Sequence, residues 1–361
     1  MIQISKRGEL SRVKGLSIRL AGLLIGVLLC TLLTVVTTGK NPLDVFAALI
    51  KGSFGTERKT WLFLQKSSIL LLISLAVTPA FKMRCWNLGA EGQVLAGAMA
   101  AAACMVLMGR AGLSSGLVVV CMLIAAIAAG ALWAGIPAVF KARFNTNETL
   151  FTLMMNYVAT QIVAFFCVKW ENPKGSTQIG VINQKTQIGW VPQLVNRYLL
   201  VIVVAVALTA LLYLYLNYTK HGFELSVVGE SERTARYVGI KVEHVIVRTM
   251  LLSGAICGLT GFLLVGSINH TVSTTLAGGQ GFTAVMVSWL AQFNPFVMVA
   301  ASAFLIFLNT GANELATSIG LNQSFGDILT AVLIFCIIGS EFFINYKLSF
   351  HHRNREVDAH V

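Results

Sequence analysis

The sequence predicts an all-α polytopic membrane protein with about ten transmembrane helices. Apolar residues make up 56% of the 361 and charged residues 12%, and the mean hydropathy is +0.76. A water-soluble domain of this length does not have that balance. Long apolar runs recur along the chain, with polar residues gathered between them. Because the bilayer core offers no water to backbone groups, each run must cross it as a helix.

The apolar runs give ten predicted spans, one of them incomplete. The first run has a basic flank and no convincing cleavage site, which indicates a retained span rather than a removed signal peptide. The segment 281–293 is interrupted by Asn294-Pro295, so we expect it to cross part of the bilayer or to bend sharply. The predicted spans are 16–38, 67–83, 88–109, 114–139, 150–169, 197–217, 249–268, 281–293, 295–313 and 326–345.

The net charge of +12 indicates orientation rather than nucleic-acid binding. Most lysines and arginines fall between spans on one side, which the positive-inside rule assigns to the cytoplasm. Ten spans then place both basic chain ends inside, as a cytoplasmic N-terminal segment (1–15) and a cytoplasmic tail (346–361) around a single transmembrane domain (16–345). The seven cysteines occur singly, so neither a disulfide nor a metal site is expected.

Two segments predicted to lie outside are longer than simple turns. Residues 40–66 mix apolar and basic side chains, which suggests a helix lying in the membrane interface. Residues 170–196 are polar and rich in turn residues, and we call them the external loop. The external loop is a candidate docking surface for an external partner.

A polar cluster occupies the start of the predicted span at 88–109. It contains Trp86, Asn87, Glu91 and Gln93, and polar groups at such a place are costly unless they face a cavity or a partner. These residues are therefore candidates to line a substrate pathway or gate. The alternative is that Glu91 caps a half-helix or pairs with Arg84.

A second polar stripe runs along the predicted span at 150–169. Thr152, Asn156 and Thr160 recur every fourth residue and share one helix face, and Glu148 suits the helix start. This stripe can line a pathway, or it can hydrogen-bond to neighbouring helices. The stripe formed by Asn309, Asn313 and Thr317 poses the same question.

The segment 219–248 is polar, although it lies between two long apolar runs. Within it, residues 229–240 are predicted to form a short helix against the cytoplasmic face, with glycine at both ends. A simple return loop needs only a few residues, so this helix suits contact with a soluble partner. The alternative is an ordinary solvated loop.

The remaining glycine-rich motifs do not indicate catalysis. Gly254 and Gly258 form a G-x-x-x-G pattern, which favours close helix packing. The run 278–281 lacks the Lys-Ser/Thr of a phosphate loop and is better interpreted as a hinge or re-entrant turn. No catalytic constellation is apparent in the sequence, so we expect that the chain is not an enzyme and binds no cofactor.

The motifs resemble those of one family. The run NLGAEGQ at 87–93 resembles the signature of permease subunits in bacterial ABC importers, and the nucleoside branch, served by a lipoprotein of the basic-membrane-protein type, is most similar. Sugar and branched-chain amino-acid permeases are more distant. The family's later landmarks match at 147–148 with 155–157, at 228–230 with 235–240, and at 281–285 with 294–295. Five residues depart from the family pattern and bear on the substrate rather than on the class: Ser231-Glu232 in place of Asn-Pro, Trp86 in place of Phe, and the bulkier Trp289 and Ala291.

The resemblance implies an assembly in the bacterial cytoplasmic membrane. Its members would be a cytoplasmic ABC ATPase that uses the ATP, a second permease subunit (a paralogue or an identical copy) and an extracytoplasmic substrate-binding lipoprotein. Residues 219–248 would be the coupling segment, with a cytoplasmic coupling helix that receives the ATPase's motion. The matched coupling residues are Gly229, Glu230, Ala235, Arg236, Gly239 and Ile240.

The function predicted from these features is import of nucleosides. An alternative within the same class is a permease for a simple sugar such as ribose or galactose. A second alternative is a self-sufficient secondary transporter or channel, which also commonly contains broken helices. The scarcity of charge inside the predicted spans is evidence against that second alternative.

Overall fold

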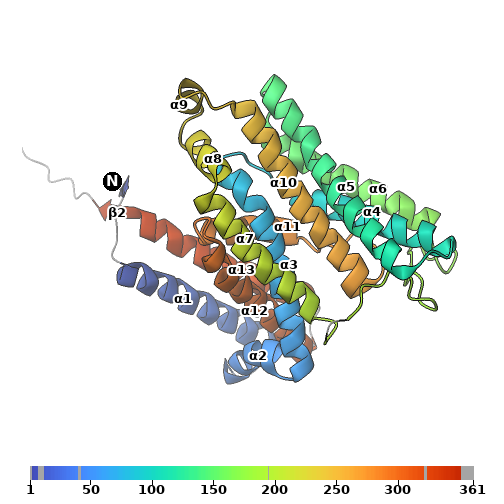
Figure 1. Cartoon of the computed structure of the whole chain (residues 1–361). Helices are drawn as coiled ribbons and strands as arrows, with labels where there is room; N and C mark the ends of the chain where they lie inside the picture. The colour runs from blue at the N-terminus through green and yellow to red at the C-terminus, as the bar shows by residue number, and fades with distance from the viewer. Residues whose placement is uncertain (1, 7–11, 40–41, 194, 321–322, 351–361) are drawn as a thin grey trace, which may run out of the picture. The chain divides into compact units, whose positions relative to one another are not determined.

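The fold of the chain was analysed in a computed structural model, which describes residues 2–6, 12–39, 42–193, 195–320 and 323–350. The chain forms two compact units, and Figure 1 colours both along the sequence. Unit 1 comprises residues 1–60 and 305–361, and unit 2 comprises residues 61–304. Much of the predicted N-terminal segment (1–15) and most of the predicted tail (346–361) lie outside the described residues.

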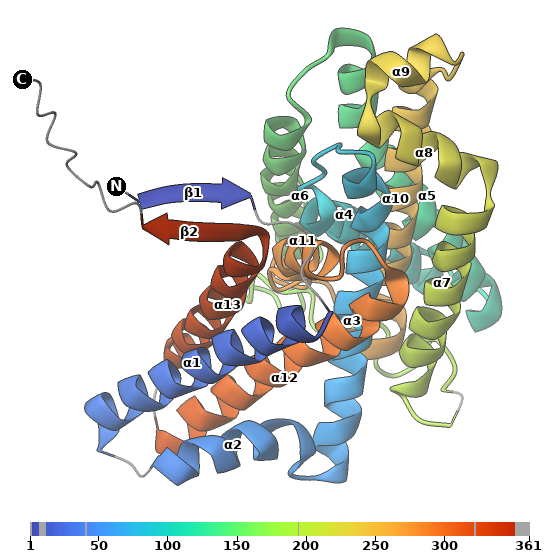
Figure 2. The same ribbon diagram turned by 90° about the vertical axis from the view of Figure 1, so that its left-hand side faces the viewer.

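Unit 1 brings the two ends of the chain together. Helix α1 (Arg12–Thr38) packs along α13 (Gln323–Asn345), and Figure 2 shows the two side by side. A Cβ added at Gly22 would lie 2.6 Å from Cβ of Ser340, so glycine permits this close approach. Strand β1 (Ile2–Lys6) pairs antiparallel with β2 (Tyr346–Phe350). This two-stranded sheet adds to the predicted all-helical fold.

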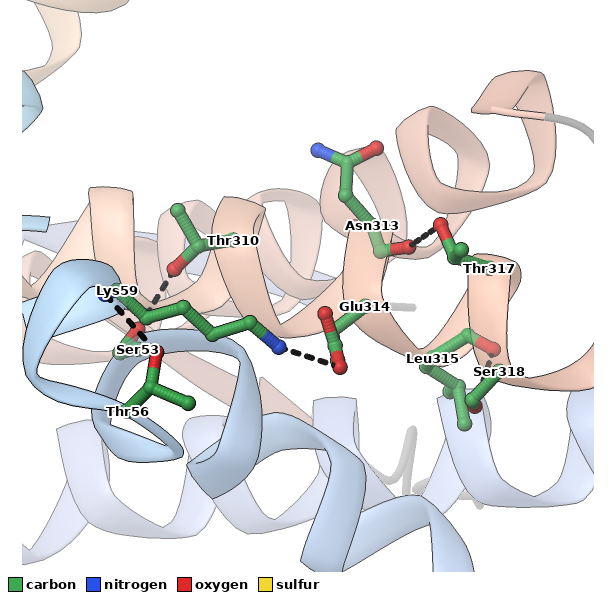
Figure 3. A network of polar contacts seen from close by, with 9 residues as sticks. All are labelled: Ser53, Thr56, Lys59, Thr310, Asn313, Glu314, Leu315, Thr317 and Ser318. Atoms are coloured by element: carbon green, nitrogen blue, oxygen red, sulfur yellow. Dashed lines mark hydrogen bonds and ion pairs between the residues drawn. The ribbon is translucent and has the colours of Figure 1, made fainter. Parts of the chain in front are cut away.

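A polar network joins helix α2 (Pro42–Phe54) and the start of α3 (Glu57–Lys82) to α12 (Pro295–Ile319), as Figure 3 shows. Lys59 Nζ lies 2.7 Å from Oε1 of Glu314. The hydroxyls of Ser53 and Thr310 are 2.7 Å apart. These pairs fasten α2 and the start of α3 to α12.

The predicted stripe on α12 bonds mainly to its own helix. Asn313 Nδ2 donates to the Asn309 carbonyl at 2.9 Å. Thr317 Oγ1 donates to the Asn313 carbonyl at 2.8 Å, as Figure 3 shows. Bonds of this kind satisfy polar groups locally when no water is available.

Unit 2 holds the remaining long helices. Helices α4, α5 and α10 pack together, and small residues let their backbones approach. A Cβ at Gly254 would meet the Gly130 carbonyl, and one at Gly258 would meet the Ala126 carbonyl. The predicted packing role of these two glycines is confirmed. The helices are α4 (Ala90–Arg110), α5 (Ser115–Phe144), α6 (Glu148–Lys169), α7 (Leu199–Tyr218), α8 (Lys220–Glu230), α9 (Glu232–Tyr237), α10 (Val242–Leu263), its π-helical continuation η1 (Leu264–Asn269) and α11 (Gln280–Leu290).

Eight helices of the described residues are long and apolar enough to cross a membrane. The other two predicted spans are shorter. The apolar part of α1 covers Ala21–Thr37, and α11 has 11 residues. At 1.5 Å per residue α11 is about 16 Å long, against about 30 Å for the hydrocarbon core. The expectation of an incomplete helix before Asn294-Pro295 is therefore confirmed.

The single interfacial helix predicted for 40–66 is wrong. The segment divides into α2 and the first turns of α3, which begins at Glu57, ten residues before the predicted span at 67–83. No glycine or proline lies between 57 and 66 to end a helix, and an acidic residue is favoured in a first turn. Helix α3 therefore begins on the N-terminal side of its apolar part.

The external loop is docked on the π-helical end of α10. The backbone N–H of Ile182 donates to the His270 carbonyl at 2.8 Å, and that of Val191 to the Gly266 carbonyl at 3.0 Å. The Trp190 ring stacks on the His270 imidazole with centroids 3.8 Å apart and planes 2° from parallel. A π-helix leaves some backbone carbonyls without their regular α-helical hydrogen bonds. The external loop donates hydrogen bonds to two carbonyls near the C-terminal end of η1, those of Gly266 and His270.

Candidate functional site

The segment between α3 and α4 is built around the side-chain amide of Asn87, which is fully buried. Its Oδ1 accepts hydrogen bonds from the Gly89 N–H and from Nε2 of Gln93, each at 3.0 Å. Its Nδ2 donates to Oγ of Ser253 on α10, also at 3.0 Å. These three bonds fix the start of α4 against α10, because an unpaired buried polar group is costly.

Two side chains of α6 hold the same segment from the other side. Asn156 accepts from the Gly92 N–H and donates to the Leu88 carbonyl, both at 2.8 Å. Thr152, one turn earlier on α6, accepts from the Leu88 N–H at 3.2 Å. The polar stripe of α6 therefore binds the backbone around the start of α4.

The Glu91 carboxylate caps helix α11. Its two oxygens accept from the N–H groups of Gly279, at 2.9 Å, and Gly281, at 2.8 Å. Negative charge at a helix N-terminus is favourable because the free N–H groups carry partial positive charge. A Cβ at Gly281 would lie 2.6 Å from the Glu91 nitrogen, and Gly279 has φ +74°. Glycine at both positions allows α11 to start directly against Glu91.

Trp86 and Trp289 form a stacked pair beside this cluster. Their ring centroids are 5.5 Å apart with planes 26° from parallel. The buried Phe81 contacts both rings edge-on, at 5.7 and 6.3 Å. Trp86 is 44% exposed and Trp289 47%, so each indole keeps a free surface.

The structure brings all six predicted pathway residues into one connected region. The amides of Asn87 and Asn156 bond to other parts of the chain, and Glu91 takes the capping role that the sequence left open as an alternative. Gln93 is buried, and its Oε1 has no hydrogen-bond partner among the described residues. Trp289 was not predicted as a site residue, although its departure from the family pattern was the signal that could have identified it.

The backbone before Trp86 is unusual. Arg84 has φ +59°, a left-handed conformation that is uncommon for a residue with a side chain. The neighbouring Cys85 is buried, and its N–H donates to the Ala80 carbonyl at 2.9 Å. Burial raises the pKa of the Cys85 thiol to about 12; Glu148 raises it further and Lys141 opposes the rise. A sharp turn whose central Cys85 is buried therefore connects α3 to the site.

The coupling segment forms two short helices, α8 and α9, so the single helix expected over 229–240 is wrong. Ser231 separates them with an extended backbone at φ −159°. Its Oγ accepts from the Thr234 N–H at 3.3 Å and so caps α9. Serine is a favoured N-cap, which explains why a new helix begins after it.

Gly229, on α8, lies directly against the end of α3. A Cβ at this position would meet the Lys82 carbonyl and lie 3.2 Å from Cα of Met83. Lys82 and Met83 immediately precede the turn that leads to Trp86 and Asn87. The coupling segment and the predicted pathway cluster are thus joined through two residues of backbone.

The other matched coupling residues shape and present α9. Ala235 is fully buried, and its carbonyl accepts from the Ile240 N–H at 2.9 Å. Gly239 has φ +84°, which ends the segment in a left-handed turn. Arg236 forms an ion pair with Glu243 at 2.7 Å. The exposed residues of this stretch are Glu230, Glu232, Arg233, Thr234, Arg236, Tyr237, Val238 and Gly239, and Tyr237 reaches 92% exposure.

Comparison with known proteins identifies the family. Residues 61–338 match the family described as the branched-chain amino acid transport system permease component, and the chain belongs to it. The predicted permease superfamily is therefore confirmed. Members are transport components rather than enzymes, and the apolar helices make this chain a multi-pass membrane protein.

Three relatives match most of the chain. The guanosine ABC transporter permease protein NupP of Bacillus subtilis is 29% identical, covering 91% of this chain and 94% of the relative. The glucose ABC transporter permease protein TsgB13 of Haloferax volcanii is 28% identical, covering 88% and 86%. The nucleoside ABC transporter permease protein NupB of Lactococcus lactis is 26% identical, covering 83% and 84%.

Proposed function

We propose that this chain is the membrane-spanning permease subunit of an ATP-driven ABC importer that translocates nucleosides. The observation that supports it best is the contact of Gly229 with Lys82 and Met83. Through this contact, a push on α8 reaches the segment that carries Trp86 and Asn87. The cytoplasmic ATPase would supply that push, and this chain would bind no ATP.

The full assembly would contain the ATPase, a second permease subunit and an extracytoplasmic lipoprotein that delivers the substrate. The second permease would be a paralogue or an identical copy. The chain would cross the bacterial cytoplasmic membrane about ten times, counting α1 and the incomplete α11, with both ends inside. The exposed surface of α9 suits contact with the ATPase, and the external loop suits contact with the lipoprotein.

A nucleoside is the substrate that the candidate site favours. A neutral nucleoside needs hydrogen-bonding groups for its polar edges and an aromatic face for its base. Trp86 offers an aromatic face, and Gln93 has an unused acceptor. Asn87, Thr152 and Asn156 would hold the pathway in shape, and Glu91 would keep α11 in place. Two of the relatives above are permeases for guanosine or nucleosides.

A simple sugar is the second candidate substrate. One relative is a glucose permease, and aromatic and amide side chains also suit a sugar. A secondary transporter would need no ATPase; the incomplete α11 would also suit it, but the contact of Gly229 with Lys82 favours the coupled arrangement.

The substrate is tested by uptake into vesicles that contain the complete assembly. Labelled guanosine, adenosine, uridine and ribose are compared, and we expect ATP-dependent uptake of nucleosides. Ribose uptake alone would move the chain to the sugar branch. If Asn87→Ala and Asn156→Ala both left uptake intact in a folded complex, the pathway assignment would be abandoned.

A further inference from the structure

The stacked pair of Trp86 and Trp289 joins two parts of the chain that are held differently. Trp289 follows Ser288, whose buried hydroxyl donates to the Ser74 carbonyl at 3.0 Å and lies 3.1 Å from the Thr78 hydroxyl. These bonds fix the end of α11 on α3. Trp289 is further supported by Phe293, with ring centroids 5.1 Å apart.

Trp86 lies on the side of the pair that the coupling segment can reach. It comes two residues after Arg84, whose φ of +59° marks a sharp backbone turn. Met83, directly before that turn, touches Gly229 of α8. A displacement of α8 therefore acts on the last turn of α3 and on the backbone that carries Trp86, whereas Trp289 is anchored through Ser288 to Ser74 and Thr78, earlier on α3.

We propose that Trp86 and Trp289 form an aromatic gate that opens by parting and selects cargo with a planar heterocyclic ring. The proposal rests on the function proposed above and adds Trp289 as a specificity-determining residue. Without cargo the two indoles close on one another. With cargo, the base of a nucleoside takes the place of the opposite indole.

The physical basis of selection is an exchange of stacking partners. Parting the two rings exposes indole faces to water, which is unfavourable for large aromatic surfaces. A planar base replaces the lost stacking contact, because it offers two π-faces and can contact both indoles. A ribose ring is puckered and has hydroxyls on its rim, so it cannot replace both contacts. The pair thus favours a nucleoside over its sugar and stays shut when empty.

The test uses Trp289→Ala and Trp86→Ala in the complete assembly, with Trp170→Ala as the matched control. Trp170 is the C-cap of α6 and packs against Phe166 at a tilt of 43°, so its removal deletes an indole outside the gate. Loss of one stacking partner should raise the KM for guanosine about tenfold, which corresponds to about 1.4 kcal/mol, with a smaller change in kcat. The control should keep the wild-type KM.

Three further readouts separate a gate from a merely structural pair. At a guanosine concentration near the wild-type KM, tryptophan emission should be quenched in the wild type and in Trp170→Ala and much less in Trp289→Ala, and ribose should quench none of them. Trp289→Phe should restore part of the guanosine affinity, because a smaller aromatic ring still stacks. Substrate already loaded in vesicles should also leak faster without ATP through Trp289→Ala.

Specific results would overturn the gate. If wild type imports guanosine and Trp289→Ala behaves like Trp170→Ala, the gate fails while the proposed function stands. If both gate variants instead separate the two permease subunits during purification, the pair is an assembly contact and the gate fails. If wild type imports no nucleoside at all, the proposed function itself fails and the gate fails with it.

Discussion

At the residue scale, the site depends on amides that bond to the chain itself. Asn87→Ala would leave Gly89, Gln93 and Ser253 each without one partner in a buried region. Unpaired buried groups cost about 1–3 kcal/mol each, so for these three groups we expect a loss of stability of at least about 3 kcal/mol. Thermal unfolding in detergent measures it.

The matched control for that prediction is Asn217→Ala. Asn217 is exposed and donates only to the Tyr213 carbonyl of its own helix. Its replacement should change stability by about 0.5 kcal/mol or less. Equal losses of thermal stability in Asn87→Ala and Asn217→Ala would show that the Asn87 network does not stabilise the fold.

The sequence predicted the members of this cluster but not their partners. The motif at 87–93 identified Asn87, Glu91 and Gln93, because polar groups in an apolar setting are conspicuous. The cap that Glu91 forms on α11 requires Gly279 and Gly281, which lie far along the chain. Spacing within one helix cannot indicate such long-range pairs.

At the element scale, the docked external loop should respond to pH. Burial, reinforced by Arg197, lowers the pKa of His270 below its ordinary value of 6.5, and a hydrogen bond with Val265 opposes this. Because the docked state resists protonation, the undocked state binds more protons below pH 6.5. Docking is therefore fully stable above that pH and weakens as the pH falls through the lowered pKa.

Hydrogen exchange of peptides that cover Ile182 and Val191 measures this docking. Their N–H groups bond to the His270 and Gly266 carbonyls, so protection reports on the loop. After correction for intrinsic rates, protection should be lower at about pH 5.5 than at about pH 7.5. His270→Gln cannot titrate and should abolish the difference. A difference of the same size in His270→Gln would assign the effect to another group.

Element boundaries were predictable where apolar runs end and unpredictable where single contacts decide. The long helices from α4 to α7 begin and end close to the predicted spans, because hydrophobic length fixes them. The break at Ser231 depends on one capping bond, and the docking of the external loop depends on η1. A turn of π-helix has no reliable sequence signal, so the docking of the loop could not be predicted.

At the scale of the whole molecule, the class was predictable and the exact number of spans was not. Composition and the recurring apolar runs predicted a helical membrane protein, and eight helices of the described residues meet the requirement for spanning. The remaining two predicted spans are short, and their role depends on the packing of neighbours rather than on hydropathy. The pairing of β1 with β2 joins the two ends of the sequence, which local patterns do not reveal.

The central claim is that α8 transmits the work of the ATPase to the pathway through Gly229. Gly229→Leu would force α8 away from Lys82 and Met83. Gly116→Leu is the matched control, because a Cβ there meets nothing within 4 Å. Overpacking costs about 1–3 kcal/mol, so the contact should be lost while both variants still reach the membrane.

The most direct measurement is ATP-dependent guanosine uptake, with ATP hydrolysis followed in the same vesicles. The account predicts that uptake falls about tenfold or more in Gly229→Leu and stays near wild type in Gly116→Leu. The ATPase should then no longer respond to substrate in Gly229→Leu. Substrate-stimulated hydrolysis and normal uptake in Gly229→Leu, with the ATPase still bound, would contradict the account and place coupling elsewhere in the chain.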